Sequence, residues 1–281
     1  MKVIVAEKCG FCHGVKNAIR MAEEILTQED EVYSLGPIIH NKDVVEQLAQ
    51  TGLKTVRKVE EIQSGTVLIR SHGAAPQQLS KLKEKGINIV DATCVLVKRL
   101  QHIAEQFERD GYKVVVIGDE NHPEVQAVVG CAKDAVVIAD ESDLHKLPRN
   151  ARLGIICQTT ESPEHFGRML GAIGRGSFRE LKVVNTLCEE AIKRQESAVR
   201  LCKQVDIMFV LGGLESANTR RLAELCKREN SETYHLQNLK ELDKRMLFGK
   251  DIAGVTAGAS TPEWIIDEFV GNLENFDCES G

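Results

Sequence analysis

Hydrophobic residues along this chain form short continuous runs, and longer stretches with helical periodicity separate them. Continuous runs rich in valine and isoleucine are typical of parallel strands that are buried on both faces. The runs lie at residues 3–6, 66–70, 87–90, 113–118, 152–157, 181–184, 207–212 and 252–258. Amphipathic helices are expected at 15–27, 97–108 and 189–203. This alternation predicts an α/β fold with mainly parallel sheets and right-handed crossovers.

The same arrangement of residues occurs three times along the chain. In each copy a strand leads into a cysteine that opens a helix, and a glycine closes the next strand 24 residues later. A polar residue follows each glycine by four positions, and a third strand ends in a small polar turn closed by proline. The copies are Cys12, Gly36, His40 with the turn 71–76; Cys94, Gly118, His122 with the turn 158–163; and Cys188, Gly212, Ser216 with the turn 257–262.

These repeats predict three similar α/β units arranged about a pseudo-threefold axis. The expected units span residues 13–93, 94–187 and 188–270, the N-terminal strand 1–12 completes the third, and 271–281 form a polar tail. Ligands of open parallel sheets bind at the carboxyl ends of the strands, where all the repeated residues lie. We therefore expect one shared central site. Under the alternative reading, the glycines and prolines serve only turn chemistry.

The three repeated cysteines indicate a metal cluster. A helix N-terminus lowers the pKa of a thiol, and thiolates bind soft metals well. Three thiolates on a pseudo-threefold axis match three corners of a [4Fe–4S] cubane, so Cys12, Cys94 and Cys188 are the predicted ligands and one iron stays open for substrate. Structural zinc is the alternative, but Cys9 and Cys12 form the one C-x-x-C and no second pair accompanies it. The other cysteines are expected to be packing or surface thiols, namely Cys9, Cys131, Cys157, Cys202, Cys226 and Cys278.

Polar residues at the strand ends predict a site for phosphate oxygens and for proton transfer. Glu124, beside His122, is a carboxylate within such a turn, and the hydroxyls of Thr159 and Thr160 could relay its proton to a leaving hydroxyl. The alternative role for Glu124 is that of an ordinary acid in the first turn of a helix. The expected donors to phosphate are His40, His72, His122, Ser216, Asn218 and Ser260.

Composition narrows the possible partners. The 281 residues carry a net charge of −6, which argues against a general nucleic-acid or membrane-surface binder. The chain begins MKVIVAEKCG without the layout of a signal peptide, and no apolar stretch approaches the roughly 20 residues of a membrane helix. We therefore expect a cytoplasmic protein. The usual nucleotide-binding loops G-x-x-x-x-G-K-[ST] and G-x-G-x-x-G are absent from the sequence.

Eight segments together resemble the signatures of the 4-hydroxy-3-methylbut-2-enyl diphosphate reductase family, and the resemblance runs from residue 1 to about 270. The segments are, in order, GFCHGVKNAI, GPIIHNKDVVEQL, RSHGAAP, VDATCVLVKRL, NHPEV, QTT, SANTRRLAEL and GVTAGASTP. The resemblance implies the trefoil of three α/β units and an oxygen-sensitive cluster on the three repeated cysteines. It also implies that the six polar donors hold a diphosphate, that Glu124 supplies protons and that Thr159 orients the substrate hydroxyl.

The implied reaction is reductive dehydroxylation of the diphosphate to isopentenyl and dimethylallyl diphosphate, with two electrons, two protons and loss of water. Because no flavin or nicotinamide motif is visible, the electrons are expected from a ferredoxin or a flavodoxin. The chain departs from the family pattern at Ala217, where a second serine is usual, and at Leu214 and Glu215, where lysine and asparagine are common. The remaining departures are at Cys9, His13, Val95 and Arg220.

Three alternatives stay open. The first is a family paralogue with the same cluster chemistry and a different small substrate, fitted to the corner at Ser216, Ala217 and Asn218. The second is a non-catalytic redox or oxygen sensor, although no DNA-binding helix or basic stripe is evident. The third is a binding protein without a cluster, which would purify colourless even in the absence of oxygen.

Overall fold

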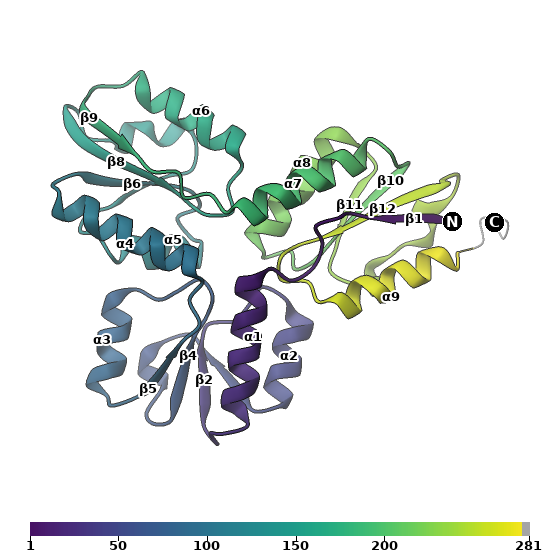
Figure 1. Ribbon diagram of the computed structural model, residues 1–281, viewed down its shortest axis with the longest axis horizontal. Helices are drawn as coiled ribbons and strands as arrows, with labels where there is room; N and C mark the ends of the chain where they lie inside the picture. Colours follow the sequence, from purple (N-terminus) through teal and green to yellow (C-terminus); the bar gives the residue numbers. More distant parts are fainter. Residues whose placement is uncertain (277–281) are drawn as a thin grey trace. The chain divides into compact units, whose positions relative to one another are not determined.

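The computed structural model describes residues 1–276, which contain three four-stranded sheets with all strand pairs parallel (Figure 1). The first sheet contains β2 (Val32–Leu35), β3 (Leu53–Val56), β4 (Thr66–Ile69) and β5 (Asn88–Asp91). The second contains β6 (Lys113–Ile117), β7 (Val136–Ile138), β8 (Ala151–Cys157) and β9 (Phe178–Val183). The third contains β1 (Lys2–Val5), β10 (Ile207–Leu211), β11 (Thr233–Leu236) and β12 (Ile252–Ala257). The predicted α/β class with three mainly parallel sheets is confirmed.

The three sheets share one strand order. They run β3-β2-β4-β5, β7-β6-β8-β9 and, read from β11, β11-β10-β12-β1. The N-terminal strand β1 therefore takes the place that β5 and β9 take in the other sheets, and Lys2 pairs with Ile252. The sequence repeat is thus a repeat of sheet topology.

Nine helices within residues 1–276 connect these strands, and their first turns lie near the strand ends that carry the repeated residues. The helices are α1 (His13–Leu26), α2 (Lys42–Gln50), α3 (Pro76–Glu84), α4 (Val95–Arg109), α5 (Pro123–Val129), α6 (Pro163–Gly174), α7 (Glu189–Cys202), α8 (Ala217–Glu229) and α9 (Glu263–Glu274). Short 3-10 helices occur at Val59–Glu61, Glu141–Lys146, Leu239–Glu241 and Lys244–Leu247. None of the helices within this part of the chain is long and apolar enough to cross a membrane.

The chain forms two compact units. Unit 1 joins Met1–Val15 and His40–Val44 to the chain from Glu189 onward, and it holds the third sheet. Unit 2 consists of Lys16–Ile39 and Val45–Cys188, and it holds the first two sheets. The expected division into 13–93, 94–187 and 188–270 stays a prediction.

Sheet faces in unit 2 explain the continuous hydrophobic runs. On β6, Val114 and Val116 pack into a core with α4, whereas Val115 and Ile117 pack into a separate core with α6. The two helices cover opposite faces of this sheet (Figure 1). A strand buried on both faces needs apolar residues at successive positions, which is why its sequence does not alternate.

The C-terminal end of the chain differs from the expected polar tail. Helix α9 continues to Glu274, so residues 271–274 are helical and Leu273 is fully buried. Apolar residues at Ile266, Phe269 and Leu273 follow helical spacing and pack into the core of unit 1. Cys278 lies outside the described residues.

Candidate functional site

The three repeated cysteines have the same backbone environment at the start of α1, α4 and α7. The amide of Cys12 donates a hydrogen bond to the carbonyl oxygen of Ala259 (3.1 Å), which lies in the same unit. The amides of Cys94 and Cys188 donate to the carbonyl oxygens of Ser71 (3.0 Å) and Thr159 (2.8 Å). Each bond joins a cysteine to the polar turn after the third strand of a repeat. The turn thereby fixes where the helix begins.

These three cysteines form no disulfide within residues 1–276, and all three are half-buried. The sulfur of Cys12 accepts a hydrogen bond from the amide of Val15 (3.4 Å), as expected for a thiolate in the first turn of a helix. Cys94 is the N-cap of α4 and has no side-chain capping bond. The first amides of a helix lack partners within the helix and can donate to a group bound there.

The other cysteines that the structure describes occupy apolar surroundings. Burial raises the pKa of Cys9 to about 11 and that of Cys131 to about 12, and it also raises the pKa of Cys157. Cys202 and Cys226 are buried against each other and share a side-chain hydrogen bond. The raised pKa values of Cys9, Cys131 and Cys157 hold these groups as neutral thiols, which are poor metal ligands because the thiolate is the ligand.

Two of the predicted histidines meet in unit 2. The rings of His72 and His122 lie edge to face, with centroids 5.3 Å apart. His122 is the N-cap of α5, and its Nδ1 accepts a hydrogen bond from the amide of Glu124 (3.3 Å). Because Nδ1 accepts, a neutral His122 carries its proton on Nε2, and that nitrogen is a donor.

Glu124 bonds to Thr159 rather than acting only as a first-turn acid. Its Oε1 accepts from the Thr159 amide (2.7 Å) and its Oε2 from the Thr159 hydroxyl (2.8 Å). Both residues are buried, with Glu124 2 % exposed. Burial raises the pKa of Glu124 above its ordinary value of 4.5, against the opposing effect of the two hydrogen bonds. Thr160, expected as a second relay, accepts instead from the side-chain amide of Gln158 (3.0 Å).

The other predicted polar donors lie in unit 1. Ser216 caps α8, and its Oγ accepts from the amide of Thr219 (3.3 Å), which leaves the hydroxyl proton available for donation. The Nδ2 atom of Asn218 is buried and has no hydrogen-bond partner within residues 1–276. Ser260 donates its hydroxyl to the carbonyl oxygen of His40 (3.3 Å).

Gly213 explains how the His40 carbonyl comes so close to the loop that precedes α8. A Cβ atom at residue 213 would collide with that oxygen, so only glycine fits there. Beyond the glycine, Leu214 is 45 % exposed and Glu215 is exposed too. Ala217 begins α8 and presents no hydroxyl. The two unusual side chains before Ser216 thus project to solvent.

The predicted residues therefore form two sets. Unit 1 holds Cys12, His40, Ser216, Asn218 and Ser260, whereas unit 2 holds Cys94, Cys188, His72, His122, Glu124 and Thr159. Within unit 2 the structure brings together the two histidines and the Glu124–Thr159 pair. Their shared use as one site stays a prediction.

Residues 3–274 match the family described as LytB protein. This chain belongs to that family. A relative from Pelobacter propionicus is 43 % identical over 275 residues, with 97 % of this chain and 98 % of the relative covered. One from Geobacter sulfurreducens is 42 % identical, with 99 % and 98 % covered. Both relatives bear the name 4-hydroxy-3-methylbut-2-enyl diphosphate reductase.

Solved structures agree with this membership. A structure of (E)-4-hydroxy-3-methyl-but-2-enyl diphosphate reductase, named as the terminal enzyme of the non-mevalonate pathway, is 40 % identical with a TM-score of 0.72. It covers 98 % of this LytB family chain and 100 % of its own. The E-1-hydroxy-2-methyl-but-2-enyl-4-diphosphate reductase of Plasmodium falciparum is 25 % identical, with a TM-score of 0.91 and with 99 % and 89 % covered.

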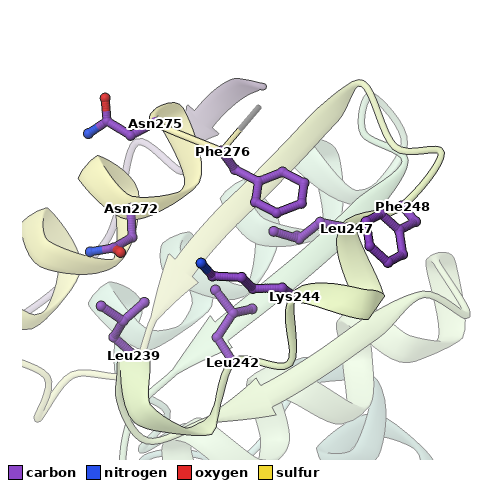
Figure 2. A pocket seen from close by; sticks show the side chains of 8 residues that line it. All are labelled: Leu239, Leu242, Lys244, Leu247, Phe248, Asn272, Asn275 and Phe276. Carbon is purple, nitrogen blue, oxygen red and sulfur yellow. The ribbon is translucent and has the colours of Figure 1, made fainter. Parts of the chain in front are cut away.

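A pocket of about 490 Å³ in unit 1 of this LytB protein involves none of the predicted residues (Figure 2). Leu239 and Leu242 lie together in this view, and Leu247 lies nearer to Phe276, which follows α9. Lys244 is the charged side chain among the described residues that line it. Five of its eight described lining residues are apolar, and the other polar ones beside Lys244 are Asn272 and Asn275.

Arg70 is a residue at the strand ends that the sequence analysis missed. It directly follows β4 and lies two positions before His72. The signal in the sequence was a charged residue at the end of an otherwise apolar strand, TVLIR.

Proposed function

We propose that this LytB family member is a 4-hydroxy-3-methylbut-2-enyl diphosphate reductase. In the proposed reaction the substrate takes up two electrons and two protons, its C–O bond to the hydroxyl breaks, and water leaves with isopentenyl or dimethylallyl diphosphate as product. The observation that carries the proposal is that relatives of this name align with 97–99 % of the chain, at 40–43 % identity. The buried acid–hydroxyl pair of unit 2 supplies the proton chemistry that such a reaction needs.

The cofactor proposed is one [4Fe–4S] cluster bound by Cys12, Cys94 and Cys188. The donor set fits, because all three cysteines are outside disulfides within residues 1–276, half-buried and located at helix N-termini, whereas burial raises the pKa of Cys9, Cys131 and Cys157. Three protein ligands leave one iron open. When bound, such a cluster supplies electrons and a Lewis-acidic iron at the reacting end of the substrate.

Glu124 and Thr159 are the proposed proton donors. The raised pKa keeps Glu124 protonated to a higher pH than an exposed glutamate, so it can act as a general acid. Its Oε2 lies 2.8 Å from the Thr159 hydroxyl, which can pass a proton outward and orient the substrate hydroxyl. The Nε2–H of His122 offers a further donor in the same unit.

The diphosphate is proposed to bind to side chains that donate hydrogen bonds. In unit 1, Ser216 retains a hydroxyl proton for donation and Asn218 has a buried amide nitrogen without a partner within the described chain. Ala217 removes one hydroxyl from this set. The complete proposed set is His40, His72, His122, Ser216, Asn218 and Ser260.

The electron donor is proposed to be a ferredoxin or a flavodoxin in the cytoplasm. The chain has none of the nucleotide-binding loops that would hold a nicotinamide or flavin. Reducing equivalents therefore have to arrive from another redox protein. The net charge of −6 on the present chain argues against nucleic acid as a partner.

An anaerobic assay tests the proposal. The protein would be reconstituted with iron and sulfide and supplied with 4-hydroxy-3-methylbut-2-enyl diphosphate and a reduced one-electron donor. We expect consumption of the substrate, release of both products and no turnover by Cys94→Ser. A brown, cluster-loaded protein that leaves this substrate unchanged would refute the assignment.

A paralogue with a different small substrate is the second candidate, and Ala217 is the observation that favours it. If the corner around Ser216 has changed specificity, then Ala217→Ser would create activity toward the diphosphate. If the wild-type protein already turns the diphosphate over, the substitution would change KM by less than about 10-fold, since one hydrogen bond contributes only about 0.5–1.5 kcal/mol.

A further inference from the structure

Arg70 is a half-buried residue whose positive charge no group within residues 1–276 neutralises. Its Nε atom is buried without a hydrogen-bond partner, and no ion pair involves the side chain within these residues. Desolvation alone lowers the pKa of Arg70 to about 10. No acidic side chain or hydrogen-bond acceptor in the described part of the chain contributes an opposing shift. Buried charges in proteins are usually paired or bind a ligand.

The backbone opposite Arg70 makes room for the guanidinium. Gly36 has a φ of +77°, and a Cβ atom there would lie 2.7 Å from Nη1 and 2.9 Å from Cζ of Arg70. The guanidinium therefore lies directly over Gly36, the residue that follows β2. Any larger residue at this position would displace it.

The second repeat provides an internal comparison. The register Ser34↔Leu68 in the first sheet and Ile117↔Cys157 in the second, continued along the strands, makes Gln158 the equivalent of Arg70. Gln158 also lies over a glycine, since a Cβ atom at Gly118 would be 2.8 Å from its Oε1.

The two equivalent side chains differ in how they are satisfied. The Oε1 of Gln158 accepts from the amide of Asp119 (3.0 Å), and its Nε2 donates to the hydroxyl of Thr160 (3.0 Å). A neutral, hydrogen-bonded side chain thus suffices for the fold at this position. The charge of Arg70 needs another explanation.

We propose that Arg70 is a further substrate-binding residue, whose guanidinium binds a phosphate group of the diphosphate. It lies at the carboxyl edge of the first sheet, two residues before His72, and its planar fork of donors matches the oxygens of a phosphate. An arriving anion supplies the missing counter-charge. This inference rests on the proposed function for the identity of the substrate, although binding of a diphosphate anion can be measured without turnover.

The test compares wild type with Arg70→Met and Arg70→Lys as cluster-loaded proteins without oxygen. Thermal midpoints are recorded alone, with inorganic pyrophosphate and with inorganic phosphate. We expect Arg70→Met to have a midpoint equal to or above that of wild type, because an uncompensated and partly buried charge is removed. We expect at least half of the pyrophosphate-induced rise to be lost, with Arg70→Lys intermediate because it keeps the charge without the fork.

Kinetics give the second readout. Arg70→Met should raise KM for 4-hydroxy-3-methylbut-2-enyl diphosphate at least 10-fold and change kcat less than about 3-fold, as expected for lost binding to a group that does not react. Arg57→Met is the matched control: Arg57 directly follows β3 in the same sheet and is exposed. It should leave both the pyrophosphate effect and KM unchanged.

The outcomes separate this inference from the proposed function. A lower midpoint for Arg70→Met with an unchanged pyrophosphate effect would make Arg70 a structural residue and overturn the inference, even if wild type turns over the substrate. A protein without turnover whose pyrophosphate effect depends on Arg70 would overturn the function and support the anion site. An equal response to single phosphate would point to a site for one phosphate group rather than the diphosphate.

Discussion

Glu124 lies in the first turn of a short helix, yet its carboxyl group bonds to a turn 35 residues away in the sequence. Both of its oxygens accept hydrogen bonds from Thr159. The helix N-terminus alone would favour the ionised form, but full burial dominates and raises the pKa. The local sequence NHPEV therefore predicts a lowered pKa for Glu124, whereas burial in the folded chain raises it.

Replacement of Glu124 by glutamine should lower kcat at least about 100-fold, because general acid catalysis typically contributes this much or more. Glutamine keeps the shape and can keep both contacts to Thr159, so KM should change little. Anaerobic turnover of the diphosphate measures both constants. Glu120→Gln, an exposed acid in the same loop, is the control, and equal losses in the two variants would contradict the assignment.

The raised pKa of Glu124 also predicts how stability depends on pH. Between its ordinary value of 4.5 and the higher folded value, the native state binds a proton that the unfolded state has lost. Stability contributed at this residue therefore falls as the pH rises through that window. Glu124→Gln removes the ionisable group, so this loss is confined to wild type. The thermal midpoint of the variant minus that of wild type should therefore increase from pH 5 to pH 8. A constant difference across this range would contradict the shift.

At the scale of elements, the second sheet depends on a close approach between α4 and β8. A Cβ atom at Gly154 would collide with the ring of Phe107, which is 2 % exposed in the core between them. The missing side chain of Gly154 thus leaves the space that the ring of Phe107 from α4 fills. Its neighbours in β8 are bulky, and this glycine is the exception.

Substitution of Gly154 by alanine should destabilise the protein by about 1–3 kcal/mol, since overpacking forces the ring or the helix to shift. Gly171→Ala is the matched comparison, because no atom lies within 4 Å of a Cβ atom there and α6 would gain about 0.5–1 kcal/mol from the better helix former. Urea unfolding measures both. A Gly154→Ala protein as stable as wild type would contradict the packing argument.

The hydrophobic pattern predicted most of the strands, but it did not identify three short strands. The expected runs at 113–118 and 207–212 correspond to β6 and β10. The three unassigned strands, β3, β7 and β11, hold three or four residues each and lie at sheet edges. Short edge strands with polar residues, such as LKTV, have neither the length nor the composition that distinguishes a strand from a loop.

At the scale of the whole molecule, the three cysteines come from widely separated parts of the chain. Cys12 belongs to unit 1, and Cys94 and Cys188 belong to unit 2. Repetition in the sequence singles out these three of the nine cysteines as predicted ligands, and that assignment stays a prediction. It could not reveal their amide bonds to Ser71, Thr159 and Ala259, because those bonds depend on how each strand end meets a turn elsewhere in the chain.

Removal of one proposed ligand should remove the cluster. Cys94→Ser, reconstituted without oxygen, should lose most of its iron, its brown absorbance and all turnover, because an alcohol is a poor ligand for iron–sulfur clusters. Cys131→Ser should keep all three, since burial holds Cys131 as a neutral thiol. Iron and sulfide analysis measures the first effect. Full iron content in Cys94→Ser would contradict the ligand assignment.

Sequence patterns predicted candidate polar site residues by type and spacing, but not the hydrogen bonds or the burial of each side chain. Ser216 was expected as a phosphate donor, and its additional role as the cap of α8 depends on the helix start at Ala217. Arg70 escaped because an arginine after a strand is ordinarily exposed. Only the packed chain reveals that it is half-buried over Gly36.

The pairing of β1 with β12 affects how the protein is made. β1 leaves the ribosome before its partner strand β12, which ends at Ala257 and follows on the order of 10 to 50 s later at usual rates of synthesis. Unit 2 lacks this dependence on the two chain ends, so it can fold while the ribosome is still translating unit 1. During that interval the nascent strand Lys2–Val5 remains an unpaired apolar edge, which makes it a target for chaperones or for mispairing with other nascent chains.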